Sequence, residues 1–141
     1  MKTLLSAIAV AALAVAIANC PASAANRPTS VVGKWAVIAN QSNDITLTIV
    51  SQGTAGACKQ IEGTMVDPAF GSNDNIEGFY CPSTGRISFL RRTGTTVNTY
   101  QVYSGNVSQI NSPQYVGGTF SLERSAALGE YEWFGTFKPG V

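Results

Sequence analysis

The sequence contains no histidine, the side chain that most often serves as a general base near neutral pH. It also lacks a nucleophile-elbow motif, a phosphate-binding loop and any cluster of residues spaced as metal ligands. A pair of cysteines alone does not make a zinc site. We therefore expect no enzyme activity, no cofactor and no metal site.

Charged residues are also scarce, at 12% of the 141 residues. Without the N-terminal segment described next, eight basic residues balance eight acidic ones, so the net charge is zero. A neutral protein has no electrostatic attraction for nucleic acid or for an anionic membrane. We expect neither as a partner.

The chain has a single long apolar run, Leu4–Ala18, which only Ser6 interrupts. Lys2 precedes this run, and the small residues Ala22–Ala24 follow it, which is the order of a secretory signal peptide. The run is too short for a good membrane span. We predict a signal peptide over residues 1–24, cleaved after Ala24, and a secreted protein, extracellular or periplasmic, with no membrane attachment after processing.

Two alternatives to this cleaved signal are a retained N-terminal anchor and a lipoprotein modified at Cys20. The lipoprotein alternative is the weaker, because Asn19 is bulky where a small residue is expected and Pro21 follows the cysteine. Cleavage after Ala24 also removes Cys20 and leaves two cysteines, Cys58 and Cys81. An even pair in an oxidising compartment normally forms a disulfide, and only one connectivity is available.

The 117 residues that remain suffice for one domain. After a short polar lead-in over residues 25–30, residues 31–141 alternate β-favouring runs with clusters of Gly, Asn, Ser and Pro. Short spacings favour sequential antiparallel neighbours. The predicted strands are Gly33–Ala39, Ile45–Gln52, Cys58–Val66, Asn75–Cys81, Arg86–Arg92, Thr99–Ser108, Tyr115–Glu123 and Tyr131–Lys138.

Five of these strands contain an internal glycine, although glycine weakens a strand. Strongly coiled strands and barrel corners explain the recurrence, because the backbone must bend or approach another strand closely there. We predict an all-β, eight-stranded antiparallel up-and-down β-barrel; the alternative is an open sandwich with glycines at bulges. The glycines are Gly63, Gly78, Gly105, Gly118 and Gly135.

The third and fourth strands form a hairpin if paired residue numbers sum to 139, which places Cys58 opposite Cys81. A bridge there would stabilise the fold by roughly 3 kcal/mol. The same register sets Glu62 opposite Glu77, and a close pair of carboxylates could act as in glycoside hydrolysis. We favour an exposed pair on the outer wall, because the opposite face is apolar and reads as the interior. That face carries Ile61, Met65, Ile76 and Tyr80.

Four short motifs resemble the avidin and streptavidin family, a branch of the calycin barrels, in order and spacing. They are Gly33–Trp35 (Gly-Lys-Trp), Gly63–Met65 (Gly-Thr-Met), Tyr103–Asn106 (Tyr-Ser-Gly-Asn) and Trp133–Thr136 (Trp-Phe-Gly-Thr). The resemblance covers nearly the whole mature chain. It implies a barrel that binds a small ligand and forms homo-oligomers, and Trp133 matches the family's tryptophan that reaches into a neighbouring subunit.

The resemblance also implies a ligand site. Several of the residues that bind biotin in the family are replaced in this sequence. Val37, Met65, Arg91 and Phe120 stand where the family has Asn, Tyr, Trp and Trp, so we do not expect tight biotin binding. Asn40 and Ser42 could restore some of the hydrogen bonds to biotin. The predicted ligand-binding residues are Trp35, Asn40, Ser42, Thr99, Gln101, Phe120 and Trp133.

Some of these residues have simpler structural roles as alternatives. Trp35 and Trp133 are more often core plugs than ligand walls. Arg91 and Arg92 could recognise an anion at a barrel mouth, but two exposed charges ending a strand is the favoured interpretation.

Two functions remain open. The first is a secreted, non-catalytic barrel that binds a small apolar or partly polar ligand. The second is a secreted protein-interaction module, an inhibitor or a self-assembling surface protein, that uses barrel loops or an aromatic outer face.

Overall fold

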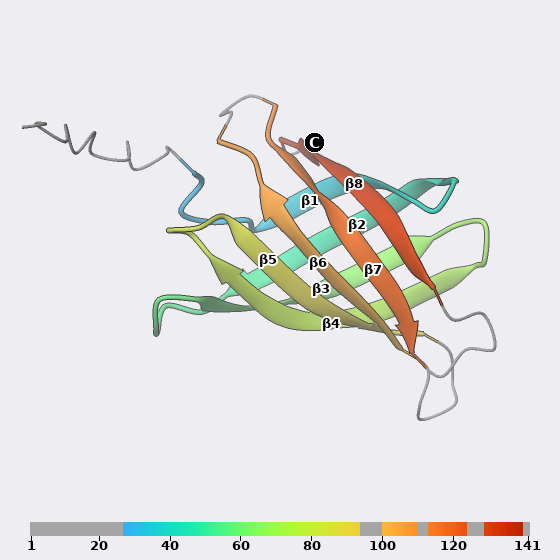
Figure 1. The fold of residues 1–141 in the computed structure, drawn as a ribbon, viewed down its shortest axis with the longest axis horizontal. Coiled ribbons are helices and arrows are strands. Elements are labelled where there is room, and N and C mark those ends of the chain that lie inside the picture. Colours follow the sequence, from blue (N-terminus) through green and yellow to red (C-terminus); the bar gives the residue numbers. More distant parts are fainter. Residues whose placement is uncertain (1–26, 94–99, 110–112, 124–128, 140–141) are drawn as a thin grey trace, which may run out of the picture.

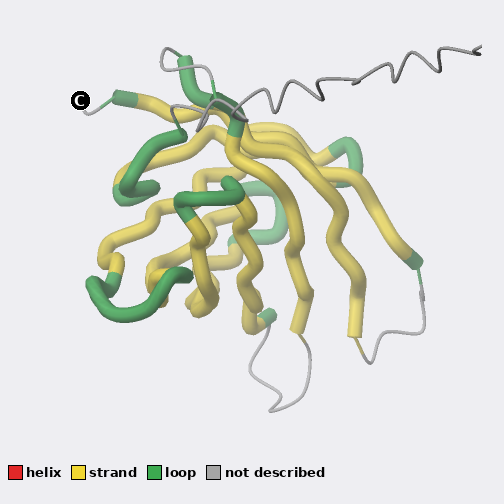
Figure 2. Tube along the Cα trace, turned by 60° about the vertical axis from the view of Figure 1, so that its left-hand side comes forward, coloured by secondary structure: helices red, strands yellow, loops and turns green. Residues whose placement is uncertain are grey.

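The computed structural model describes residues 27–93, 100–109, 113–123 and 129–139 (Figure 1). Every regular element in these ranges is a β-strand, and turns and loops make up the rest (Figure 2). The strands are β1 Gly33–Ala39, β2 Ser42–Gln52, β3 Lys59–Asp67, β4 Ser72–Cys81, β5 Arg86–Arg92, β6 Tyr100–Val107, β7 Tyr115–Glu123 and β8 Glu130–Lys138.

Each strand pairs antiparallel with the next, and β8 pairs antiparallel with β1, so the sheet closes into a barrel. Trp35 of β1 lies opposite Phe137 of β8, for example, and Ala39 lies opposite Trp133. Closure satisfies the edge strands that an open sandwich would expose. The predicted eight-stranded up-and-down barrel is confirmed.

The predicted bounds of β1, β5 and β7 are those observed, and the largest differences concern polar strand ends. β2 begins at Ser42, three residues before the predicted start, while β3 extends to Asp67 and β4 begins at Ser72. Ser, Asn and Asp have low strand propensity, and the prediction therefore ended the strands before them. In the structure, ladder pairing carries the strands through these residues to tight turns.

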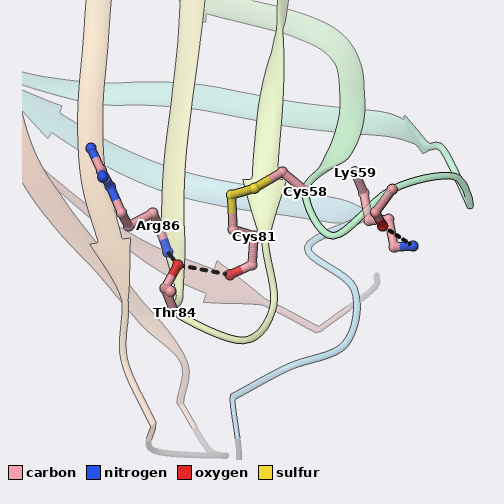
Figure 3. Close-up of a disulfide and its surroundings, with 6 residues drawn as sticks. Cys58, Lys59, Cys81, Thr84 and Arg86 are labelled. Carbon is pink, nitrogen blue, oxygen red and sulfur yellow. Dashed lines mark hydrogen bonds between the residues drawn. A yellow bond between two sulfur atoms is a disulfide. The ribbon is translucent and has the colours of Figure 1, made fainter.

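The β3–β4 hairpin has the predicted register, with Glu62 opposite Glu77 and Lys59 opposite Tyr80. Cys58, just before β3, is bonded to Cys81 at the end of β4, with the two Cα atoms 4.0 Å apart. Figure 3 shows this bridge and the Thr84 hydroxyl, which lies 3.4 Å from the Cys81 carbonyl oxygen in the following turn. The disulfide therefore fastens the hairpin at the end away from its own turn.

Alternate residues of the strands fill the barrel interior, including the four predicted for the hairpin, Ile61, Met65, Ile76 and Tyr80. Mid-strand glycines let neighbouring strands coil closely around this core. A Cβ added at Gly63 would collide with the carbonyl oxygen of Thr48 across the β2–β3 ladder. These contacts agree with the close strand approach predicted from the glycine pattern.

The N-terminal segment 27–32 closes one end of the barrel, called here the closed end. Val31 is fully buried, and its carbonyl accepts a hydrogen bond from Trp35 Nε1 at 3.1 Å. The Tyr80 hydroxyl donates to the Pro28 carbonyl at 2.6 Å. Thus the polar lead-in, where it is described, is tied to the barrel. The β1–β2 and β3–β4 turns lie at the other end, called here the open end (Figure 1).

Within the described ranges we find no apolar helix of the length that a membrane span requires. The same ranges contain no group of three or more His, Cys, Asp or Glu side chains arranged to hold a metal ion.

Candidate ligand-binding pocket

A pocket of about 450 Å³ occupies the open end of the barrel. Its rim comes from the β1–β2 turn, with Asn40 and Gln41, and from the β3–β4 turn, with Phe70. Its floor is the buried interior of the strands. The residues that line the pocket are Ala39, Asn40, Gln41, Ser42, Ile45, Asp67, Ala69, Phe70, Arg91, Gln101, Tyr103, Phe120 and Leu122.

Aromatic rings from four successive strands form one wall beneath and beside this pocket. Phe89 stacks on Tyr103 with ring centroids 4.7 Å apart, and Tyr103 stacks on Phe120 at 4.8 Å. Phe120 in turn stacks on Tyr131 at 5.4 Å. Trp133 meets Phe89 and Tyr103 edge-on and donates from Nε1 to the Ser104 carbonyl at 3.0 Å. The rings are fixed by packing and offer flat apolar faces.

A buried ion pair stands against this aromatic wall. Arg91 is only 5% exposed, and its guanidinium contacts the Asp74 carboxylate through Nε at 2.8 Å and Nη2 at 2.7 Å. Nη2 also donates to Ser72 Oγ at 2.8 Å, and Nη1 donates to Gln101 Oε1 at 3.3 Å. A buried charge is tolerated when it is paired and hydrogen-bonded in this way.

Tyr103 joins the aromatic wall to these polar groups. Its hydroxyl donates to Gln101 Oε1 at 2.8 Å, the same oxygen that Arg91 approaches. Burial, which removes the phenol from water, raises the pKa of Tyr103 above the usual value for tyrosine. The phenol is therefore neutral, and acts as a donor, throughout the physiological pH range.

A second buried carboxylate, Asp67, lines the pocket and is 3% exposed. It accepts a hydrogen bond from the Ala69 backbone N–H at 3.2 Å. The Ser42 hydroxyl lies 3.4 Å from Oδ1 and 3.5 Å from Oδ2, beyond the usual range for an O–H···O bond. Asp67, which lines the pocket, is therefore held weakly and keeps free acceptor capacity.

Comparisons with known proteins bear on the fold. No protein-family model matches the sequence, and no curated protein matches it either. The solved structure of a low-affinity mutant of shwanavidin is similar, with a TM-score of 0.58 and 17% sequence identity. The similarity covers 79% of this chain and 98% of that one. The fold is avidin-like.

The avidin-like barrel gathers four of the seven predicted ligand-binding residues in one place: Asn40, Ser42, Gln101 and Phe120 all line the pocket. Trp35 lies at the closed end, where it plugs the barrel, as the structural alternative for it proposed. Thr99 lies outside the described residues.

Trp133 differs from the expectation drawn from the resemblance. It is 3% exposed and buried in its own barrel, so its indole is not available to reach into a neighbouring subunit. The reason is its position within β8, where period-two alternation turns it inward with Gly135. It supports the pocket from below and does not line it.

Sequence reasoning assigned the wrong side to Arg91 and missed two acids. Arg91 does not end β5 as an exposed charge; it follows Ile87 and Phe89 on the inward face, as strict alternation requires. Only Arg92 is exposed on the outer wall. Asp67 and Asp74 fall between the predicted strands Cys58–Val66 and Asn75–Cys81, and are in fact buried strand residues.

The acid pair considered for catalysis lies on the outer wall, as favoured. Glu62 and Glu77 are cross-strand neighbours, both exposed, and Glu77 is paired with Arg92. Both carboxylates are exposed, and Arg92 holds Glu77, so the pair lacks the buried surroundings in which a carboxylate pair acts as acid and base.

The β1–β2 turn at the rim is held in an unusual backbone conformation. Asn40 has φ of 44° and Gln41 has φ of 69°, both in the left-handed region. Asparagine tolerates this region, whereas a residue such as glutamine enters it at a cost of about 1–2 kcal/mol. Strain of this kind is often retained at binding sites.

Replacing Gln41 with glycine should relieve that strain and raise the free energy of unfolding, by up to about 1 kcal/mol after the entropy cost of glycine. Chemical denaturation of the wild type and of Gln41→Gly measures the change. Gly53→Ala, outside the left-handed region and far from the pocket, is the control. A clear loss of stability in Gln41→Gly would show that the glutamine side chain itself stabilises the turn.

Proposed function

We propose that this protein is a secreted, non-catalytic binding barrel that holds one small, partly apolar and partly polar ligand in the pocket at the open end. The observation that carries the proposal is the 450 Å³ pocket in an otherwise filled barrel. Pockets for small molecules commonly measure about 300–1,000 Å³. Barrels of eight strands are wide enough to hold one small ligand at the mouth.

The construction of the pocket supports this proposal. Rigid apolar faces, those of Tyr103 and Phe120, stand beside two polar groups, Asp67 and Gln101. Such a combination holds a ligand by burial of apolar surface and orients it by hydrogen bonds. At the opposite end, Trp35 and Val31 fill the barrel, so a ligand would enter and leave through the rim.

Secretion is part of the proposal, and two features support it. The first is the signal-like segment 1–24 with its small residues before Ala25. The second is the Cys58–Cys81 disulfide, a bond that persists in oxidising compartments and is rare in the cytosol.

Native mass spectrometry on protein purified from the secreted fraction of its host tests these points together. We expect a mature N-terminus near Ala25 and a copurified small molecule. Leu122→Trp, which would fill the pocket from its half-buried rim position, should lose that molecule. Ser104→Trp, on the exposed outer face of β6, should keep it. An N-terminus at Met1, or a ligand retained by Leu122→Trp, would contradict the proposal.

The protein-interaction function has one observation in its favour. A groove of about 820 Å³ lies on the outer wall, and Ile38 and Phe134 are exposed cross-strand neighbours in it. Tyr115 stacks on Phe134 with centroids 5.5 Å apart, which extends the apolar surface. The subunit count in the same native mass spectra distinguishes the small-ligand function from the protein-interaction function. Assembly that Phe134→Ser abolishes, without any bound small molecule, would favour an interaction module.

A further inference from the structure

In the described part of the chain, the buried charged side chains are Asp67, Asp74 and Arg91, two acids and one base. All three belong to the open end, and together they carry a formal charge of −1. Each guanidinium nitrogen of Arg91 already has a partner among Asp74, Ser72 and Gln101. Asp74 balances the charge of Arg91, so the ion pair as a unit offers an anionic ligand no net charge.

Asp67 is the side chain left without a counter-charge. Neither of the two ion pairs among the described residues involves it. The Ser42 hydroxyl comes no closer than 3.4 Å to the Asp67 carboxylate. The Ala69 backbone N–H is the other donor to that carboxylate among the described contacts. A carboxylate that is only 3% exposed and belongs to the lining of a pocket favours a ligand that donates hydrogen bonds and carries positive charge.

The apolar part of the pocket suits the same kind of ligand. Tyr103 and Phe120 present stacked ring faces, and a cation is attracted to the face of an aromatic ring. Phe70 is 79% exposed at the rim, where an apolar body could cover it.

From this arrangement we propose that the pocket selects a compact organic cation: an aromatic or aliphatic body with an amine, amidinium or guanidinium head that donates to Asp67. The inference rests on the proposed function of the same pocket and adds the charge of its ligand. It also assigns Asp67 as the residue that determines specificity, and Arg91 as a positioning residue that holds Asp74 and Gln101 in place.

Three probes of nearly equal size and different charge test the proposal: benzamidine is a cation, benzamide is neutral and benzoate is an anion. Each is titrated into the isotopically labelled, purified protein, and binding is followed by two-dimensional NMR. We expect benzamidine to bind at least about tenfold more tightly than benzoate, with benzamide between them. The signals of Tyr103, Gln101 and Leu122 should shift.

Asp67→Asn keeps the shape of the side chain and removes its charge. It should abolish most of the preference for benzamidine over benzoate. Asp44→Asn is the matched control, because Asp44 is an exposed acid at the same end of the barrel that does not line the pocket. That variant should retain the preference of the wild type. The comparison of the three probes on the unaltered protein needs no variant, so a folding defect in Asp67→Asn leaves the test intact.

The outcomes distinguish the cation preference of the pocket from the proposed small-ligand function. Binding of all three probes with equal affinity, or tighter binding of benzoate, would overturn the cation preference and leave the proposed small-ligand function standing. A preference that survives in Asp67→Asn would overturn the role of that residue. Failure of every probe to perturb the pocket signals at millimolar concentration would count against both.

Discussion

Replacing Arg91 with methionine should lower the free energy of unfolding by about 3–5 kcal/mol, the usual cost of removing one partner from a buried ion pair. The variant would leave Asp74, which is 9% exposed, without a counter-charge in the barrel interior. It would also remove the N–H groups that donate to the Ser72 hydroxyl and to the Gln101 side-chain oxygen. The methionine would fill much of the same volume, so the loss reports charge and hydrogen bonding more than packing.

The next residue in the sequence provides a matched control. Arg92 also pairs with a β4 acid, Glu77, but the two side chains are 66% and 55% exposed on the outer wall. Exposed ion pairs contribute about 0–1 kcal/mol, so Arg92→Met should cost no more than that. Urea denaturation of the wild type and the two single variants measures the difference between the two sides of one strand.

Replacing both members of the buried pair tests the cause of the loss. Arg91→Met combined with Asp74→Leu should recover most of the stability, because no unpaired charge from this pair would then remain inside. If the double variant is no more stable than Arg91→Met alone, the geometry of the hydrogen-bond network, and not the unpaired charge, controls stability at this end of the barrel. Equal effects of Arg91→Met and Arg92→Met would contradict the burial of Arg91.

The fold could be predicted from the sequence because its main determinants are local. Alternation of apolar residues marked the strands, short spacers made them sequential neighbours, and two cysteines fixed the register of one hairpin. Once Cys58 was placed opposite Cys81, the pairing of Glu62 with Glu77 followed. The period of two then assigned an inner and an outer face to each residue of β3 and β4.

The polar half of the pocket was missed because its residues contradict the simplest rule for an interior. Asp67, Asp74 and Arg91 are types that are almost never buried unless paired, so they were assigned to turns and to the surface. A signal was nevertheless present: if the 139 register is continued by one residue beyond Asn75, Asp74 lies opposite Met65 on the inward face. Alternation from Ile87 and Phe89 likewise placed Arg91 inside.

The pairing of Arg91 with Asp74 and the conformation of the β1–β2 turn could not be predicted from the alternation of apolar residues. The pairing of Arg91 with Asp74 depends on the register between β4 and β5, where Ile76 lies opposite Arg91. No disulfide or other local mark fixes that register in the sequence. The two-residue β1–β2 turn, with non-glycine residues in the left-handed region, also has no glycine to signal it.

Biotin should bind this protein weakly or not at all, although the fold is avidin-like. In the family that the sequence resembles, biotin is held by a ring of polar partners and a box of tryptophans. The resemblance matches Val37, Met65, Arg91 and Phe120 to four of those residues, and all four are buried in the barrel. Because they face the interior in a closed ladder, a one-residue shift of register would bring only outward-facing residues to their places.

The loss of binding free energy for biotin can be estimated. Two lost hydrogen bonds at about 1–3 kcal/mol each, and two lost tryptophan walls at about 2–3 kcal/mol each, remove roughly 6–12 kcal/mol. Each 1.4 kcal/mol is a factor of ten, so even a site near the limit of non-covalent affinity would weaken by at least about four orders of magnitude. Asn40 and Ser42 do line the pocket and could return a part of this.

Isothermal titration with biotin measures the outcome directly, and an avidin sample in the same buffer is the positive control. We expect a dissociation constant far above about a nanomolar, the value that corresponds to some 12 kcal/mol. Biotin also carries a carboxylate, so its uncharged methyl ester should bind no worse than the acid if Asp67 dominates the pocket. A nanomolar constant would mean that Asn40, Ser42 and Gln101 rebuild the polar grip from other positions, and that Phe120 and Tyr103 suffice as walls.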